Sequence, residues 1–319
     1  MTETGKLFDR VCLIGLGLIG SSIGAAIHKL KLADHVTGYA ASQQTRQSAA
    51  RIGFVDSVHE TAADAAKDAD LVILCAPIGV MEAITLEIAP ALKPGCILTD
   101  VGSVKKAVIS AVAPHTPDHV HFIPGHPIAG SEKSGPESGY PELFVDRWCI
   151  LTPLPDADQD AVKKLENFWK ALGSSVEVMT PSHHDSVLAI TSHLPHLIAY
   201  SIVSTASDLE DVTSSEVIKF SAGGFRDFTR IAASDPTMWR DVFLTNKDAV
   251  LEMLGRFSED LSALQRSIRW GDGDALYDLF SRSKETRQQI IEAGQDTAAP
   301  DFGREHHTDR LTDKHNEDK

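Results

Sequence analysis

The sequence predicts an α/β fold with a doubly wound parallel sheet, followed by an all-helical domain. Up to residue 180, short and almost continuously apolar runs alternate with stretches of helical pattern, which is typical of a parallel sheet covered on both faces. Beyond Thr180 we find no strand candidate of comparable quality, and long helical stretches follow. We predict an α/β domain over residues 1–180, a helical domain over 181–295 and a disordered polar tail over 296–319.

The predicted elements follow from these apolar runs. Strands are expected at Val11–Gly15, His35–Ala40, Leu71–Pro77, Cys96–Ser103, His121–Gly125, Arg147–Pro153 and Ser174–Thr180. Helices of the first domain are expected at Leu18–Leu30, Thr45–Arg51, Val80–Leu92, Val104–Val112 and Ala161–Leu172, and those of the second at His184–Ala206, Val212–Phe220, Pro236–Trp270 and Asp274–Ala293. From Val242 to Leu264, apolar residues recur at three- and four-residue steps. Such a stripe is too apolar for one exposed helix and favours a dimer.

Composition narrows the class of protein. The net charge is −15 and no basic patch is visible, which argues against nucleic-acid binding. Cys12, Cys75, Cys96 and Cys149 each lie in an apolar run and match no metal motif, so we expect buried thiols rather than disulfides. The apolar stretch Val187–Ser204 contains two histidines and a proline, which favours a buried helix over a membrane span. Since the N-terminus lacks an apolar signal core, we expect a soluble cytoplasmic protein.

A glycine motif at the first strand predicts a nucleotide site. Gly15, Gly17 and Gly20 form G-x-G-x-x-G between a strand and a helix. The first glycine permits a tight turn, the second lets backbone approach a pyrophosphate, and the third lets the helix pack on the strand. This context predicts a Rossmann-like dinucleotide-binding domain. Leu18 and Ile19 in the first helical turn, and Ala76 and Pro77 at the end of the third strand, complete the expected cofactor site.

The second strand bears on the choice between NAD and NADP. A carboxylate at its end would accept a hydrogen bond from the ribose 2′-hydroxyl of NAD. The chain instead reads GYAASQQTRQ, with Ser42, Thr45 and Arg46 at this place. Hydroxyls and a guanidinium suit a 2′-phosphate, so the pattern weakly favours NADP, although Arg46 could equally be a solvated helix charge.

Two polar segments follow later strands. Ser103 in DVGSVK and His126 in HPIAGSEKSG both come after strand ends, where ligands gather in open α/β sheets. Ser103 could also cap the helix from Val104, while Lys105 and Lys106 are expected in solvent. His126 is the group best suited to take a proton near neutral pH.

The helical domain adds candidate binding residues. His193 and His196 lie three apart, but without a third ligand in register we predict no metal site. Arg226, Arg230 and Arg240 lie in a fairly apolar segment with Trp239. Because a guanidinium binds carboxylates through a planar fork, this cluster suits a small carboxylate substrate.

Taken together and in order, GLGLIGSSIG, DVGSVK, HPIAGSEKSG, SHLPH and FRDFTRIAASDPTMWRD resemble the prephenate/arogenate dehydrogenase family of tyrosine biosynthesis, over roughly Val11 to Ala293. The resemblance implies a helical dimerisation domain and oxidative decarboxylation of prephenate or arogenate. It implies that His126 is the catalytic base, which takes the proton of the substrate's ring hydroxyl, and that Ser103 helps to hold that hydroxyl and the histidine. It also implies that Arg230 binds a substrate carboxylate. His196, Ser131, Glu132 and Trp239 match pocket residues, and Arg226 lies near them.

Two other functions fit parts of the pattern. One is a different two-domain dehydrogenase acting on a β-hydroxyacid or an imino acid, whose base typically lies on the helical part. The other is a nucleotide-sensing protein without catalysis. The position of His126 at the sheet edge favours the prephenate/arogenate dehydrogenase family over the other dehydrogenase class. The nucleotide-sensing alternative predicts instead that His126→Asn leaves function intact.

Overall fold

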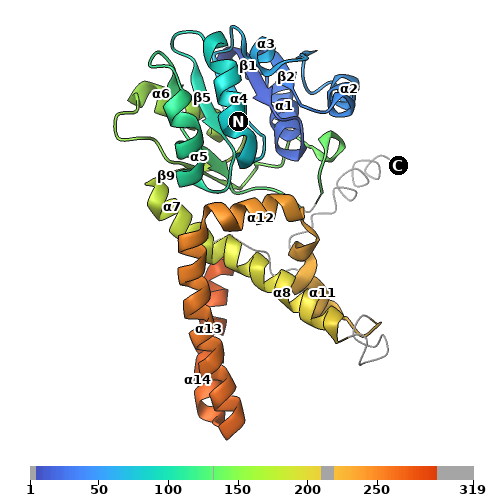
Figure 1. Cartoon of the computed structure of the whole chain (residues 1–319), viewed down its shortest axis with the longest axis vertical. Coiled ribbons are helices and arrows are strands. Elements are labelled where there is room, and N and C mark those ends of the chain that lie inside the picture. Colours follow the sequence, from blue (N-terminus) through green and yellow to red (C-terminus); the bar gives the residue numbers. More distant parts are fainter. Residues whose placement is uncertain (1–4, 132, 210–218, 293–319) are drawn as a thin grey trace, which may run out of the picture. The chain divides into compact units, whose positions relative to one another are not determined.

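The computed structural model describes residues 5–131, 133–209 and 219–292 (Figure 1). Its contacts divide the chain into two compact units. The first comprises Met1–Phe220 with Phe228–Met253, and the second comprises Ser221–Asp227 with Leu254–Lys319. The first unit thus joins the α/β domain with the first helices that follow Pro181.

The α/β domain is built on a six-stranded parallel sheet, which confirms the predicted fold class. Its strands are β1 (Phe8–Ile14), β2 (Ala33–Tyr39), β3 (Ser57–Val58), β4 (Leu71–Leu74), β5 (Ile97–Asp100) and β6 (His121–Phe122), in the spatial order β3-β2-β1-β4-β5-β6. This is the Rossmann order, in which the chain reverses direction across the sheet between β1 and β4. The carboxyl ends of these two central strands therefore border the crevice where such sheets bind ligands.

Helices cover both faces of this sheet (Figure 1). They are α1 (Leu18–Leu30), α2 (Gln43–Ile52), α3 (Ala62–Ala66), α4 (Met81–Ile88), α5 (Lys105–Val112) and α6 (Gln159–Ala171). Alternate residues of β1 enter different cores: Val11 and Leu13 pack with residues of α1 and α6, whereas Cys12 and Ile14 pack with α3, α4 and α5. Burial on both faces explains why the strands read as continuous apolar runs. Two short elements, β3 and α3, were not predicted.

A second, three-stranded sheet corrects the expectation that the later strands extend the parallel sheet. It consists of β7 (Gly125–Pro127), β8 (Trp148–Leu151) and β9 (Ser175–Val178), and β7 runs antiparallel to β8. The single run predicted at His121–Gly125 is divided between the two sheets. Between the two halves, the Gly125 N–H donates to the Asp100 side chain (3.1 Å to Oδ1) rather than to a backbone carbonyl of β5, and the ladder with β5 ends there. The polar loop after β7 therefore starts from this second sheet.

The helices after Thr180 are more broken than predicted. They are α7 (Pro181–Leu188), a π-helical turn (Ala189–His193), α8 (Leu194–Asp208), α11 (Gly223–Thr229), a 3-10 turn (Arg230–Ala233), α12 (Pro236–Thr245), α13 (Lys247–Trp270) and α14 (Gly273–Glu292). The single helix predicted at Pro236–Trp270 is wrong, because Asn246 breaks it. The helix predicted at Val212–Phe220 lies outside the described residues except for its last two positions.

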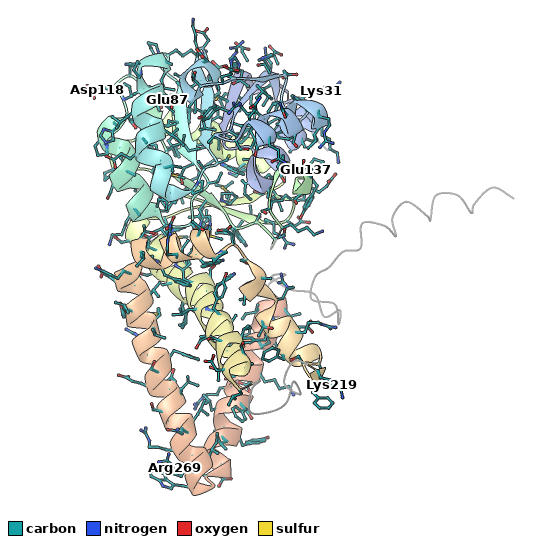
Figure 2. All side chains as sticks on the ribbon, turned by 45° about the vertical axis from the view of Figure 1, so that its right-hand side comes forward. Lys31, Glu87, Asp118, Glu137, Lys219 and Arg269 are labelled. Carbon is teal, nitrogen blue, oxygen red and sulfur yellow. The ribbon has the colours of Figure 1, made fainter. Side chains whose placement is uncertain are left out.

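In the second unit, the later part of α13 and α14 run side by side in both views and turn at Gly271, whose φ is +68° (Figures 1 and 2). Side chains project along the pair, and Arg269 marks the turn end of α13 in Figure 2. Many of the projecting side chains are large and apolar: Trp270 is 74% exposed and Tyr277 73%. Apolar surface of this extent is typical of an interface between proteins.

The stretch Pro181–Asp208 is the one described helical segment long and apolar enough to cross a membrane by length and composition. Core helices of globular proteins pass the same test. At its start, α7 packs against α5, and His184 and Asp185 are buried there among protein groups. Polar groups satisfied by neighbouring protein favour the predicted globular role of this segment.

All four cysteines are unpaired, and Cys12, Cys96 and Cys149 are buried as predicted. The prediction that Lys105 is solvated is wrong. Its side chain is fully buried, and Nζ donates to Asp100 Oδ2 and to the Gly125 carbonyl, both at 2.5 Å. Burial lowers the pKa of Lys105, and Asp100 opposes this effect. The buried ion pair fixes the first residue of β7 to the end of β5.

We predict that Lys105→Met destabilises the protein by about 3–5 kcal/mol, because it leaves the Asp100 carboxylate buried without its cation. Urea denaturation measures the loss. Lys106→Met is the matched control: Lys106 is exposed, and its replacement should change stability by less than about 0.5 kcal/mol. Equal stability of the two variants would show that the buried pair contributes nothing.

Candidate functional site

The glycine-rich loop lies between β1 and α1, with each glycine in a different steric setting. Gly15 has φ +107°, and an added Cβ would lie 2.5 Å from the Cys75 carbonyl group. At Gly20 the same atom would lie 2.1 Å from the Gly15 oxygen. At Gly17 it would meet nothing within 4 Å, so protein packing does not explain this glycine. The close approach of a ligand phosphate explains it, because α1 begins here without a side-chain cap and its first N–H groups are left for an anion.

The other predicted cofactor residues surround this loop. Leu18 and Ile19 form the first turn of α1, and Ala76 and Pro77 follow β4, with the Ala76 nitrogen beside Gly15. Ser42 caps α2 by accepting a hydrogen bond from the Thr45 N–H. Arg46 Nη1 donates to the carbonyls of Ala40 (2.7 Å) and Ala41 (3.0 Å), directly after β2. Arg46 is therefore tied to the end of β2 rather than extended into solvent.

The polar loop that begins at His126 reaches the same region. At its far end, the Tyr140 N–H donates to Ser22 Oγ on α1 at 3.1 Å. An added Cβ on Gly139 would lie 2.0 Å from Ser21 Oγ. The loop thus runs from β7 to the first turns of α1. Ser131 in it is exposed and its Oγ accepts from the Lys133 N–H, while Glu132 lies outside the described residues.

Ser103 lies between β5 and α5, but it does not cap that helix as predicted. Helix α5 begins at Lys105, and its cap comes from a distant residue: the Asp185 carboxylate accepts from the N–H groups of Lys105 (2.8 Å) and Lys106 (3.0 Å). Burial alone would raise the pKa of Asp185, but hydrogen bonds from His184 and these N–H groups lower it. The carboxylate is therefore ionised at neutral pH, and the Ser103 side chain is not used as the cap.

His126 lies on β7 and contacts a second histidine. Its Nδ1 is 2.8 Å from His184 Nε2, and His184 Nδ1 is 2.8 Å from Asp185 Oδ1. Burial, together with the charges of His184 and Lys105, places the pKa of His126 well below its usual value. Burial also lowers the pKa of His184. Both imidazoles are therefore neutral at pH 7, and His126 can accept a proton.

A further buried histidine lies on the π-helical turn. Asn246 Nδ2 donates to the Asp185 carbonyl (2.9 Å) and lies 3.1 Å from His193 Nδ1. Because this amide nitrogen is a donor, His193 Nδ1 accepts and its proton is on Nε2. Among the described residues, this Nε2–H and the buried Trp239 Nε1–H have no hydrogen-bond partner. Each unpaired donor costs about 1–3 kcal/mol, which a ligand oxygen would offset.

Trp239 connects this histidine to the predicted substrate residues. Its ring stacks on His196 with centroids 3.7 Å apart, and it packs against Val104. His196 Nδ1 donates to the Ser192 carbonyl. Burial lowers the pKa of His196, and the nearby charge of Arg230 lowers it further. The structure thus brings together His196, Trp239 and Arg230, next to the carboxyl end of β5.

Arg226, which was predicted to lie near the substrate-binding residues, belongs to the second unit and not to the first. In the second unit its Nε donates to Asp227 Oδ1 at 3.2 Å. Three residues of the site were not predicted at all: His184, Asp185 and Asn246. Little in the sequence signals their burial: helix α7 reads PSHHDSVL, in which His184 and Asp185 stand among polar residues.

Comparison with known proteins places the chain among dehydrogenases. Residues 23–178 match the family model of the prephenate dehydrogenase nucleotide-binding domain, and residues 180–282 match that of its dimerisation domain. A cyclohexadienyl dehydrogenase of Zymomonas mobilis is 40% identical over 88% of this chain and 96% of its own length. A prephenate dehydrogenase of Bacillus subtilis is 34% identical, covering 89% and 77% respectively.

Solved structures agree. A prephenate dehydrogenase from Aquifex aeolicus, solved with hydroxyphenyl propionate and NAD⁺, superposes with a TM-score of 0.82 at 32% identity, covering 88% of this chain and 98% of that one. A Synechocystis arogenate dehydrogenase gives a TM-score of 0.74 at 26% identity over 88% and 99%. In the described residues, no group of three His, Cys, Asp or Glu side chains could hold a metal ion.

The glycine loop yields a paired prediction. Gly20→Ala should destabilise the protein by about 1–3 kcal/mol, because its methyl group overlaps the Gly15 carbonyl. Gly17→Ala should leave stability unchanged and weaken NAD(P)H binding, because its methyl group occupies the side open to phosphate. Urea denaturation and a fluorescence titration with NADH and NADPH measure the two effects. If both variants lose stability and neither loses affinity, the steric assignment is wrong.

Proposed function

The chain belongs to the prephenate dehydrogenase family, and from this premise we propose that it oxidatively decarboxylates prephenate, arogenate or both, in tyrosine biosynthesis. The observation that carries the proposal is a neutral, partly buried imidazole, His126, at the ligand-binding edge of a dinucleotide-binding domain. The N-terminal domain is nucleotide-binding, and the chain is an oxidoreductase by family.

The reaction needs one base and correct orientation. The substrate ring carries a hydroxyl on one carbon and a carboxylate on the opposite carbon. A nicotinamide cofactor held at the glycine loop would supply the acceptor for the hydride of the hydroxyl-bearing carbon. His126 takes the hydroxyl proton as the C–H bond breaks, and the ring carboxylate leaves as carbon dioxide while the ring becomes aromatic. We propose that Ser103, which follows β5 at this edge, helps to hold the same hydroxyl.

Binding of the anionic substrate falls to the group around Trp239. Arg230 supplies positive charge for a carboxylate, and its effect on His196 shows that the two lie close together. The unpaired N–H groups of His193 and Trp239 offer further donors to substrate oxygens. Ser131 and Glu132 belong to the loop that we propose encloses the substrate, and Arg226 remains a candidate without a placed role.

We propose NADP as the preferred cofactor, because no acidic residue follows β2 and Arg46 is fixed at its end. The Aquifex aeolicus relative was solved with NAD⁺, so the preference needs a direct test. Rates with prephenate and arogenate, each with NAD and NADP, measure substrate and cofactor choice together. We expect a higher kcat/KM with NADP, and Arg46→Ala should reduce that advantage. A higher kcat/KM with NAD would contradict the cofactor proposal.

His126→Asn should lower kcat by about 10²–10⁴-fold with nearly unchanged cofactor affinity, since it removes the base. In the unmutated enzyme, the base is active when neutral, so turnover is lost only as pH falls through the pKa of His126, well below 6.5. Turnover as a function of pH, with NADPH titration as control, checks both statements. A variant with normal turnover would instead support the nucleotide-sensing alternative. Activity only on a β-hydroxyacid or imino acid would support the other dehydrogenase class.

We further propose a homodimer in the cytoplasm. The matched C-terminal family model is a dimerisation domain, and α14 has no buried residue among those described. A second copy that covers the apolar side chains of α13 and α14 would remove them from water. Sedimentation of the full chain tests this assembly.

A further inference from the structure

The roles of the ring nitrogens around His126 can be assigned by following the hydrogen bonds inward from Asp185. Its Oδ1 accepts from the Lys105 N–H and its Oδ2 from the Lys106 N–H. Backbone N–H groups can only donate, so the carboxylate receives hydrogen bonds on both oxygens. An ionised carboxylate has no proton to give. His184 Nδ1, which is 2.8 Å from Oδ1, must therefore carry a proton and donate it.

This assignment determines the next contact. A neutral imidazole has one donor and one acceptor nitrogen, so a His184 that donates from Nδ1 accepts at Nε2. The nitrogen facing it at 2.8 Å is His126 Nδ1, which must then be the donor. The proton of neutral His126 is thereby on Nδ1, and the lone pair is on Nε2. Only that nitrogen remains to receive a proton from substrate.

The opposite arrangement would require a doubly protonated His184. Its burial and the nearby Lys105 charge disfavour the cation, although Asp185 favours it. Other titratable groups near the pair are Asp100 and His193. His193 is itself neutral at pH 7, since burial lowers its pKa to about 4. Neutral imidazoles are thus consistent with both hydrogen bonds of this series, from His184 to Asp185 and from His126 to His184.

We infer that His184 is a positioning residue that holds His126 in the Nδ1–H tautomer, with Asp185 and the N-terminus of α5 fixing His184 in turn. The catalytic consequence rests on the proposed function, but the tautomer does not. When the substrate hydroxyl gives its proton to His126 Nε2, the Nδ1–H stays bonded to His184, and no second proton has to move. The cation that forms keeps its hydrogen bond to His184 Nε2.

Three variants test the inference. His184→Leu removes the acceptor that faces His126, while His184→Gln can supply a carbonyl oxygen at a similar reach. His183→Leu is the matched control, because His183 is the exposed neighbour on the same helix. Nitrogen-15 NMR of histidine-labelled full-length protein reads the tautomer of His126 directly, with His126→Asn used to assign its signals. Steady-state kinetics then read the effect on turnover.

We expect the unmutated protein and His183→Leu to show His126 protonated at Nδ1, and His184→Leu to show a mixture or the Nε2–H form. His184→Leu should lower kcat by roughly 10²-fold at nearly constant KM, since loss of the residue that orients a catalytic imidazole costs up to about 10⁴-fold. His184→Gln should recover most of the turnover. A purely structural role would lower the activity and melting temperature of both His184 variants together.

The possible failures are distinguishable. An Nε2–H tautomer in the unmutated protein overturns the inference whatever the enzyme's substrate is. Full turnover of folded His184→Leu overturns the positioning role and leaves the proposed function intact. Absence of turnover on prephenate and arogenate overturns the proposed function, while the NMR measurement still decides the tautomer. If His184→Leu does not fold, His184→Gln still tests the inference: an Nε2–H tautomer of His126 in the folded glutamine variant, with unchanged turnover, would overturn the positioning role.

Discussion

The Asp185 carboxylate is the constraint on which the rest of the site depends. It is almost fully buried, and a buried charge is stable only when its lone pairs are engaged. Its partners come from two places: the N–H groups of Lys105 and Lys106 at the start of α5, and His184 on its own helix. Satisfying this one group therefore fixes α7 against the carboxyl end of β5 and aligns His184 with His126. The backbone carbonyl of the same residue holds Asn246, which orients His193. One buried anion thus links His126, the proposed base on β7, with His193 on the π-helical turn.

Features of the fold that are signalled within a short stretch of sequence were predicted, whereas features that depend on contacts between distant residues were not. The Rossmann-like domain was predicted because its signals are local: apolar runs of strand length, a glycine motif, and a change of pattern after residue 180. The second sheet was missed because Pro124 divides a run that reads as one strand, and only pairing with β8, some 25 residues later, shows where each half belongs. The break between α12 and α13 was missed for a similar reason. Asn246 is tolerated within many helices, and here it ends one because its amide is held by Asp185 and His193.

The candidate site shows the same contrast between local signals and long-range contacts. His126, Ser103 and Arg230 were predicted as site residues because they stand near strand ends or in a motif of recognisable chemistry. Two of the hydrogen bonds that define the protonation of His126 are distant in sequence. His126 and His184 are 58 positions apart, and Lys105 and Asp185 are 80 positions apart. Nothing in a single sequence records such distances. Lys105 is an example of a prediction that failed for this reason. A lysine next to a second lysine is expected in solvent, yet Lys105 is fully buried because Asp100 and the Gly125 carbonyl accept hydrogen bonds from its ammonium group. Buried polar networks are invisible to hydrophobic patterning.

The histidines of the site share one property that bears on how the proposed reaction could work. Burial lowers the pKa of each of them: His126, His184, His193 and His196. A carboxylate-bearing substrate raises the pKa of any imidazole it approaches, because it stabilises the cation. A base with an ordinary pKa would then be partly protonated in the complex and unable to accept the hydroxyl proton. Starting from a lowered value, His126 stays neutral until the chemical step. In the proposed reaction, the positive charge for the substrate carboxylate comes instead from the guanidinium of Arg230. Burial and the neighbouring Lys105 charge thus keep the proposed base neutral, while a separate side chain supplies the proposed binding charge.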